Sequence, residues 1–213
     1  MSPVEREYLN RLCLRIKNET DPVLFTELVV ELDDFLRCTD DRRPEPRFNP
    51  PVVQTSDEQN PYLRFRGSRW IRDLLGASIA ATNADFGNVQ LFDSKNGVLR
   101  IVANEGFETD FLEYFETVDC SAHCACGVAM NRQSRIVVGD VATNSVLSGE
   151  SGQMLLQSNV RSVQSTPLID MSGRFVGIVS THYRHVDGPQ PGMWPQADQI
   201  AASFMWQVQG VSG

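Results

Sequence analysis

The sequence predicts an α+β fold in which helices pack on an antiparallel sheet. Two pairs of strand-like runs, at residues 88–103 and 162–183, are each interrupted by a short turn signal. Strands joined by so short a turn pair in an antiparallel manner. In the stretches before, between and after these runs, apolar residues recur every three or four positions, as in amphipathic helices. This order of strand hairpins and helices indicates an α+β sandwich.

The first 38 residues predict a helical hairpin that precedes this domain. Over residues 3–18, apolar side chains lie four positions apart and form one face of a helix. A second apolar helical pattern follows Asp21 and Pro22, which are residue types preferred at the N-cap and first position of a helix. Because such a hairpin buries little surface alone, we expect it to pack on the rest of the chain or on a second copy.

Residues 39–66 have no helical or strand periodicity and predict a proline-rich linker. Pro44, Pro46, Pro50 and Pro51 fall in this stretch, followed by a polar run at 55–58. The sequence therefore predicts three parts, namely the hairpin over 1–38, the linker over 39–66 and the main domain over 67–213.

Within the main domain, turn residues separate the expected elements. The turn signals lie at 93–97 and 170–173. In order, we expect a helix over 70–79, strands over 88–92 and 98–103, a helix around 107–115, a strand over 135–138, a helix over 151–158, strands over 162–169 and 174–183, and a helix over 195–208.

Charge and composition exclude several classes of function. The formal net charge is -8 and no basic run occurs, so we expect neither nucleic acid nor an anionic membrane surface as a partner. No apolar run approaches the ~18 residues that a membrane-spanning helix needs. The first residues lack the features of a secretory signal and the cysteine count, five, is odd. We therefore expect a cytoplasmic protein with reduced thiols.

Short motifs follow one another in a recognisable order between residue 67 and about residue 208. They are Ala84–Leu91, Gly97–Ala103, Gly106–Phe107, Cys126–Ala129, Asp140–Ala142, Val163–Leu168 and Ser172–His182. Together they resemble the GAF domain, a ligand-binding sensory module of bacterial signalling proteins. The sequence is most similar to the GAF domains found beside histidine kinase and PAS modules.

The resemblance implies a GAF-like, six-stranded antiparallel sheet with helices on one face as the dimerisation side. It also implies a small-molecule pocket under loops on the other face. The positions that face this pocket in the family are the candidate ligand-binding residues, Gln90, Phe107, Phe111, Cys126, Asp140, Gln164, Ser180 and His182. Polar side chains inside an apolar sheet need partners, and a polar ligand, one another or water could supply them. No residue receives a catalytic role.

Three cysteines and a histidine lie within residues 120–127, and several interpretations of this cluster stay open. Cys120, His123 and Cys124, with Cys126 behind them, offer thiolate and imidazole groups to a metal ion. Structural zinc sites usually draw their ligands from two separate elements, whereas these residues would all lie on one loop. The structural interpretation is that small residues are needed in a tight turn that leads into a helix.

The resemblance suggests two further uses of the cluster. One GAF branch reduces free methionine sulfoxide, and the step Cys126–Gly127 is similar to one of its cysteine positions. The later loop, at 143–150, is where we would expect the catalytic cysteine of that branch, and it contains none. Covalently attached bilins use the order Cys-His, whereas this chain has His123–Cys124. The signature of cyclic-nucleotide sites is not recognisable, although residues 104–107 resemble its start.

The leading hypothesis is a sensory or regulatory GAF protein that binds a small molecule and has no catalytic activity of its own. The sequence does not identify the ligand or assign a cofactor. No output module follows the domain within these 213 residues. We therefore expect the signal to pass through a homodimer or through a partner such as a histidine kinase. The alternatives are a thiol reductase of the free methionine sulfoxide type and a metal- or tetrapyrrole-binding GAF sensor.

Overall fold

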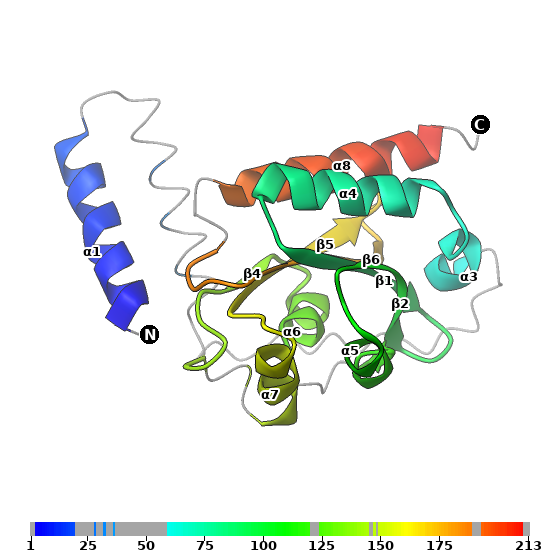
Figure 1. The fold of residues 1–213 in the computed structure, drawn as a ribbon. Coiled ribbons are helices and arrows are strands. Elements are labelled where there is room, and N and C mark those ends of the chain that lie inside the picture. The colour runs from blue at the N-terminus through cyan, green and yellow to red at the C-terminus, as the bar shows by residue number, and fades with distance from the viewer. Residues whose placement is uncertain are drawn as a thin grey trace. The chain divides into compact units, whose positions relative to one another are not determined.

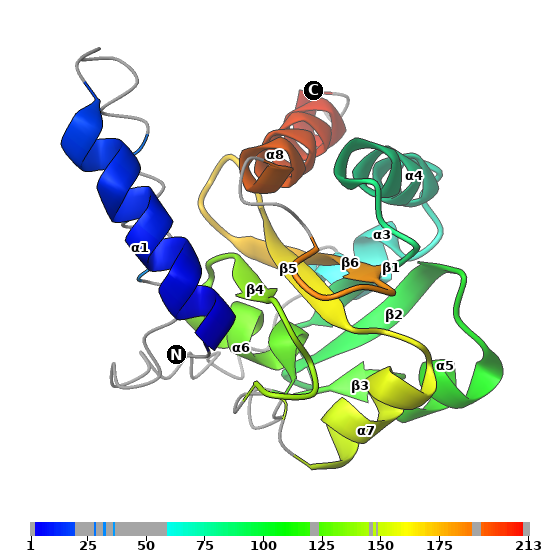
Figure 2. The ribbon, with the colours of Figure 1, turned by 60° about the vertical axis from the view of Figure 1, so that its left-hand side comes forward.

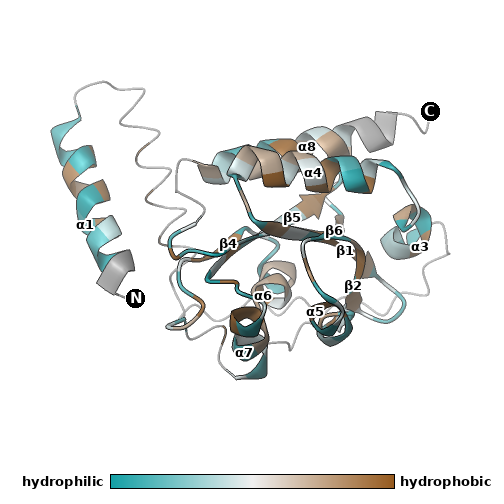
Figure 3. Ribbon diagram, viewed as in Figure 1, coloured by the Kyte–Doolittle hydropathy of each residue, from teal (hydrophilic) through white to brown (hydrophobic). Residues whose placement is uncertain are grey.

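The computed structural model describes residues 3–19, 28, 32, 36, 59–119, 124–144, 147, 149–188 and 193–210. The chain divides into two compact units, Met1–Pro44 and Glu45–Gly213. In the first unit, helix α1 spans Pro3–Asn18, which confirms the first helix expected from the sequence. Figure 3 shows this helix as largely hydrophilic. The second helix of the expected hairpin falls mostly outside the described residues and stays a prediction, as do the three domain boundaries.

The second unit contains the expected six-stranded antiparallel sheet. Its strands lie in the order β3-β2-β1-β6-β5-β4, so β1 and β6 are central (Figure 1). Every neighbouring pair is antiparallel. The bounds are Phe86–Asp93 for β1, Val98–Glu105 for β2, Thr117–Val118 for β3, Ile136–Val138 for β4, Ser162–Ile169 for β5 and Phe175–Tyr183 for β6. The sequence predicted all of these strands except β3, which has only two residues.

Helices cover both faces of the sheet. Helices α4 (Trp70–Thr82) and α8 (Trp194–Gly210) lie side by side on one face, and Figures 1 and 2 show them together. Helices α5 (Thr109–Tyr114), α6 (Ala125–Arg132) and α7 (Glu150–Gln157) lie on the other face. Four of them, α4, α5, α7 and α8, were expected from the sequence within a few residues of these bounds, whereas for α6 the sequence indicated only that a helix follows the cysteine cluster. Within the described residues, no helix is long and apolar enough to span a bilayer.

A short helix, α3, occupies Pro61–Phe65, inside the range where the sequence suggested only a linker. It packs on β1. The side chain of Asn60 caps α3 by accepting a hydrogen bond from the Tyr62 N–H, and its Nδ2 donates to Asp93 Oδ1 over 2.9 Å. The last part of the expected linker is therefore attached to the end of β1.

Asp93 organises the hairpin between β1 and β2. Its Oδ2 accepts hydrogen bonds from Asn96 Nδ2 over 2.7 Å and from Arg100 Nε over 2.9 Å. Burial raises the pKa of Asp93, but the hydrogen bonds from Asn96, Asn60 and Arg100 favour the carboxylate and lower the pKa to about 2. The turn predicted at 93–97 is therefore held by a carboxylate that stays ionised at neutral pH.

The two faces of the sheet form two separate hydrophobic cores. On β1, Val89 and Leu91 face α4 and α8, whereas Phe86 and Phe92 belong to the core under α5, α6 and α7. This alternation is the ordinary period of two of a strand. Every residue of β1 and β6 is buried. The central strands therefore have no solvent-facing side.

Because β6 lies so close to β1 at Gly177, we expect a methyl group added there to lower the stability of the domain. A Cβ added at Gly177 would lie 2.1 Å from the backbone oxygen of Gln90, which cannot move without disturbing β1. We expect Gly177→Ala to lower the free energy of unfolding by about 1–3 kcal/mol or more, measured by urea denaturation. Gly76→Ala on α4 is the control, because nothing lies within 4 Å of its added Cβ. That variant should gain about 0.5–1 kcal/mol, and equal losses in both variants would contradict the prediction.

Candidate functional site

Five buried polar side chains share the sheet face that α5 and α6 cover. We call them the polar row, which consists of Asn88, Gln90, Ser165, Ser180 and His182. Cross-strand register places Asn88 opposite Ser180 and Ser180 opposite Ser165. Along β1 and β6, residues of the polar row alternate with residues of the core under α4 and α8. Because side chains alternate between the two faces of a strand, the polar row points away from α4 and α8.

Three members of the polar row have buried atoms without a hydrogen-bond partner in the part of the chain that the structure describes. These atoms are Asn88 Oδ1, Gln90 Oε1 and His182 Nδ1. The side chains are at most 4% exposed, so bulk water does not reach them. Ser180 differs, because its hydroxyl bonds that of Ser165 over 2.8 Å. A buried polar atom without a hydrogen-bond partner lowers the stability of the fold by about 1–3 kcal/mol. These three atoms therefore need polar partners that the described residues do not supply.

His182 lies against two aromatic rings. Its ring meets Phe107 edge to face, with centroids 4.9 Å apart, and Phe111 in the same manner over 6.0 Å. The two phenylalanine rings stack on each other over 3.6 Å. Burial lowers the pKa of His182 from 6.5 to about 3, because the apolar surroundings disfavour the imidazolium. At neutral pH the ring is uncharged, with one nitrogen able to donate a hydrogen bond and the other able to accept one.

Gln164 and Asp140 do not join the other candidate residues. Gln164 pairs across the sheet with Thr181, and its Nε2 donates to Thr166 Oγ1 over 3.1 Å on the face that α4 and α8 cover. Asp140 follows β4, where it is half-buried and forms an ion pair with Arg161 over 3.2 Å. Of the eight residues expected from the sequence, the structure places Gln90, Phe107, Phe111, Cys126, Ser180 and His182 on one side of the sheet.

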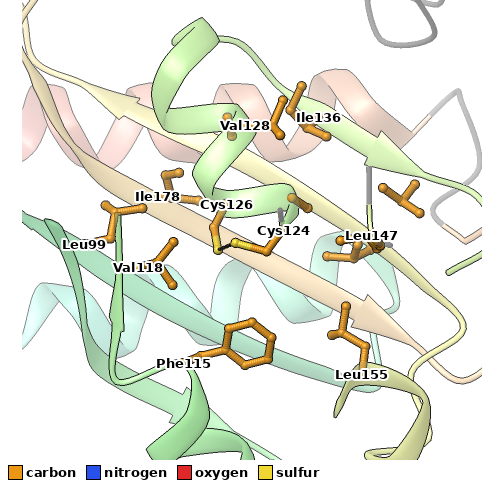
Figure 4. Close-up of a cluster of buried hydrophobic side chains, with 14 of the residues drawn as sticks. Leu99, Phe115, Val118, Cys124, Cys126, Val128, Ile136, Leu147, Leu155 and Ile178 are labelled. Carbon is orange, nitrogen blue, oxygen red and sulfur yellow. Dashed lines mark hydrogen bonds between the residues drawn. The ribbon is translucent and has the colours of Figure 1, made fainter. Parts of the chain in front are cut away.

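Two cysteines form a second constellation at the start of α6. Cys124 is the N-cap, and its Sγ accepts a hydrogen bond from the N–H of Gly127 over 3.4 Å. The Sγ atoms of Cys124 and Cys126 lie 3.2 Å apart. Figure 4 shows the two sulfurs directed toward each other among Leu99, Val118 and other apolar side chains.

The two thiols differ in acidity. The hydrogen bond from Cys126 lowers the pKa of Cys124, the backbone N–H of Gly127 acts in the same direction, and burial opposes both. The hydrogen bond to Cys124 and burial raise the pKa of Cys126 well above its usual value. The arrangement therefore favours ionisation of Cys124 before Cys126, in which case the S–H of Cys126 donates to the Cys124 sulfur.

The metal interpretation of the cysteine cluster rests on residues that lie partly outside the described ones. Cys120 and His123 belong to the undescribed stretch 120–123, so their relation to Cys124 stays a prediction. Among the described residues, no three histidine, cysteine or carboxylate side chains are grouped closely enough to hold a metal ion.

Asn88 and Ser165 belong to the polar row, although neither was among the residues expected from the sequence. Asn88 lies two positions before Gln90 in an otherwise apolar strand, so the alternation alone could have identified it. Ser165 could not be identified in this way, because only the register of β5 on β6 places it opposite Ser180.

Comparisons with known proteins identify the fold. No protein-family description matches the sequence, and no curated protein matches it either. Solved structures do match. A domain assigned to a two-component sensor histidine kinase of Sinorhizobium meliloti 1021 is 22% identical, with 66% of this chain and 88% of that chain covered and a TM-score of 0.54. The GAF domain region of a protein assigned as a membrane protein of Geobacter sulfurreducens PCA is 17% identical, with coverages of 72% and 99% and a TM-score of 0.57.

An enzyme has the same fold. The free methionine-R-sulfoxide reductase of Neisseria meningitidis, solved in complex with its substrate, is 17% identical, with 68% of this chain and 84% of that chain covered and a TM-score of 0.51. The GAF fold expected from the sequence motifs is therefore confirmed. At these identities the likeness concerns the fold, and sensory domains and an enzyme share it.

The buried neutral imidazole of His182 predicts a pH-dependent stability. The unfolded chain binds a proton at this ring below pH 6.5, whereas the folded chain binds it only near pH 3. The free energy of unfolding should therefore fall as the pH drops from 6.5, by up to ~1.4 kcal/mol per unit from this residue. Urea denaturation of His182→Phe should lack this part of the slope. The side-chain NMR signals of His182 should not titrate between pH 7 and 5, and a titration there would contradict the assignment.

Proposed function

We propose that this GAF-fold domain is a sensory module that binds a small polar molecule between the sheet and helices α5 and α6. The observation that carries the proposal is the set of unpartnered atoms, Asn88 Oδ1, Gln90 Oε1 and His182 Nδ1, on one face of two neighbouring strands. A ligand with matching hydrogen-bonding groups would remove the cost of leaving them unpaired.

The side chains of the polar row indicate which kind of chemical group of the ligand would bind there. Two amides and a neutral imidazole carry no charge, so they favour an uncharged group with both donors and acceptors. Phe107 and Phe111, stacked beside His182, supply an apolar wall next to these polar atoms. Cys126 lies in the same hydrophobic cluster and would border the site from α6.

The same Gln→Met substitution, made once on each face of the sheet, tests this site. Gln90 and Gln164 are each 1% exposed, and each has an unpartnered Oε1, but they point to opposite faces. Native mass spectrometry of freshly purified protein should show a retained small molecule, seen as added mass. We expect Gln90→Met to lower the retained fraction at least tenfold, because one buried hydrogen bond is lost, whereas Gln164→Met should retain it. Equal retention in the two variants, or no added mass in the unchanged protein, would refute the proposed site.

The same proposal includes a homodimer as the means of signalling, with the outer surface of α4 and α8 as the interface. Trp206 on α8 is 65% exposed, which is unusual for so large an apolar side chain. A second copy or a partner of the histidine kinase type would receive the signal, in a cytoplasmic setting. The support is the exposed tryptophan together with the similar domain assigned to a sensor histidine kinase.

Replacement of this tryptophan tests the dimer. We expect light scattering after size exclusion to report twice the chain mass, and Trp206→Ala to shift the population toward the monomer. Met171→Ala is the control, because Met171 is also exposed, at 68%, but lies in the turn between β5 and β6. A monomeric unchanged protein would exclude the dimer, and a shift in both variants would exclude this interface.

The competing function is reduction of free methionine sulfoxide. Its support is the shared fold and a pair of thiols in the same hydrophobic cluster as Phe107 and Phe111. Against it, residues 143–150 contain no cysteine. Turnover of free methionine sulfoxide with a thioredoxin system would establish the reductase, and no turnover would leave the binding function.

A further inference from the structure

The cysteine pair at the start of α6 has three features that together go beyond packing. The two Sγ atoms lie 3.2 Å apart, the N–H of Gly127 points at the sulfur of Cys124, and Cys124 is the N-cap of α6. Ordinary buried cysteines act as small apolar residues and need none of these contacts. A sulfur at the N-terminal end of an eight-residue helix also lies at the positive end of its dipole.

We propose that Cys124 and Cys126 form a two-electron redox site, in which a peroxide oxidises the dithiol to an intramolecular disulfide. Cys124 is the attacking residue, because the N–H of Gly127 and the S–H of Cys126 both stabilise its thiolate. Cys126 is the resolving residue, because it is already in contact with the sulfur that becomes oxidised.

The reaction balances without any other reagent. The thiolate of Cys124 attacks one peroxide oxygen, so an S–O bond forms, the O–O bond breaks and the other oxygen leaves as water after protonation. The sulfur of Cys126 then attacks the resulting sulfenic acid, so the S–S bond forms and the S–O bond breaks. A second water leaves with the thiol proton. Two thiols and one hydrogen peroxide give one disulfide and two waters.

The approach that the disulfide requires is small. A disulfide bond is about 2 Å long, so the two sulfurs, which lie 3.2 Å apart, must move together by about 1.2 Å. The movement has a local consequence, because a disulfide sulfur is a weaker acceptor than a thiolate. Oxidation should therefore weaken the cap on the N–H of Gly127 and loosen the first turn of α6.

Peptide mapping tests the proposal directly. Trypsin releases residues 101–132 as one peptide that holds Cys120, Cys124 and Cys126, whereas Cys13 and Cys38 fall on other peptides. The Cys120→Ser chain keeps both proposed residues and leaves only one possible pair within that peptide. After treatment with hydrogen peroxide and alkylation, we expect this peptide to have lost two hydrogens and to carry no alkyl group. Dithiothreitol should restore two alkylation sites.

Single replacements assign the two roles. In the Cys120→Ser chain, where Cys120 cannot act as a resolving thiol, we expect a further Cys126→Ser replacement to stop the reaction at the sulfenic acid, which dimedone traps on Cys124. A further Cys124→Ser replacement should give neither disulfide nor trapped adduct. Hydrogen exchange at the amides of the first turn of α6 should accelerate on oxidation of the Cys120→Ser chain. If this chain keeps both thiols alkylatable at a peroxide concentration that oxidises the exposed Cys13, the proposal is wrong. Because that chain carries the decisive measurement, poor folding of the other variants does not prevent a decision.

Discussion

The burial of β1 and β6 on both faces is the constraint on which the rest of the domain depends. Each of these strands is paired on both edges and covered by helices above and below, so every one of their residues is buried. An antiparallel sheet often leaves one face to water, and polar side chains then need no explanation. Here a polar side chain on either strand must find its partner inside the protein. Ser180 does so through Ser165, whereas Asn88, Gln90 and His182 keep unpartnered atoms.

The same two strands present different chemistry to their two faces. Toward α4 and α8 they contribute Val89, Leu91 and Val179, which pack in an apolar core. Toward α5 and α6 they contribute the polar row, beside the aromatic rings of Phe107 and Phe111. On β1 and β6, all three side chains with unpartnered atoms point to this face, whereas Gln164 on β5 has its unpartnered Oε1 on the face under α4 and α8. This difference between the two faces of β1 and β6 supports the proposal that the ligand binds on the side of α5 and α6.

The sequence predicted the elements well because turn residues mark them, and it was weaker wherever distant segments meet. The signals at 93–97 and 170–173 define both hairpins, and the strand bounds follow within a few residues. Gln164 was expected beside the other candidate ligand-binding residues but lies on the opposite face of the sheet. The face to which a strand residue points depends on the register, and a shift of one residue reverses it. Helix α3 looked like linker because Asp93, which binds its capping residue Asn60, lies far along the chain. The contact between Cys124 and Cys126 likewise depends on the start of α6.

Helix α6 connects the two proposed sites. It packs on β4, β5 and β6, and Cys126 belongs to the same hydrophobic cluster as Phe107 and Phe111. A disulfide that loosens the first turn of α6 would therefore change one wall of the ligand site, and a ligand that presses on this wall would change how readily the sulfurs approach. Such coupling is reciprocal by thermodynamic necessity, so the factor by which oxidation alters the ligand affinity equals the factor by which the ligand alters the dithiol–disulfide equilibrium. A single helix N-terminus would in this way let one domain respond jointly to a small molecule and to an oxidant.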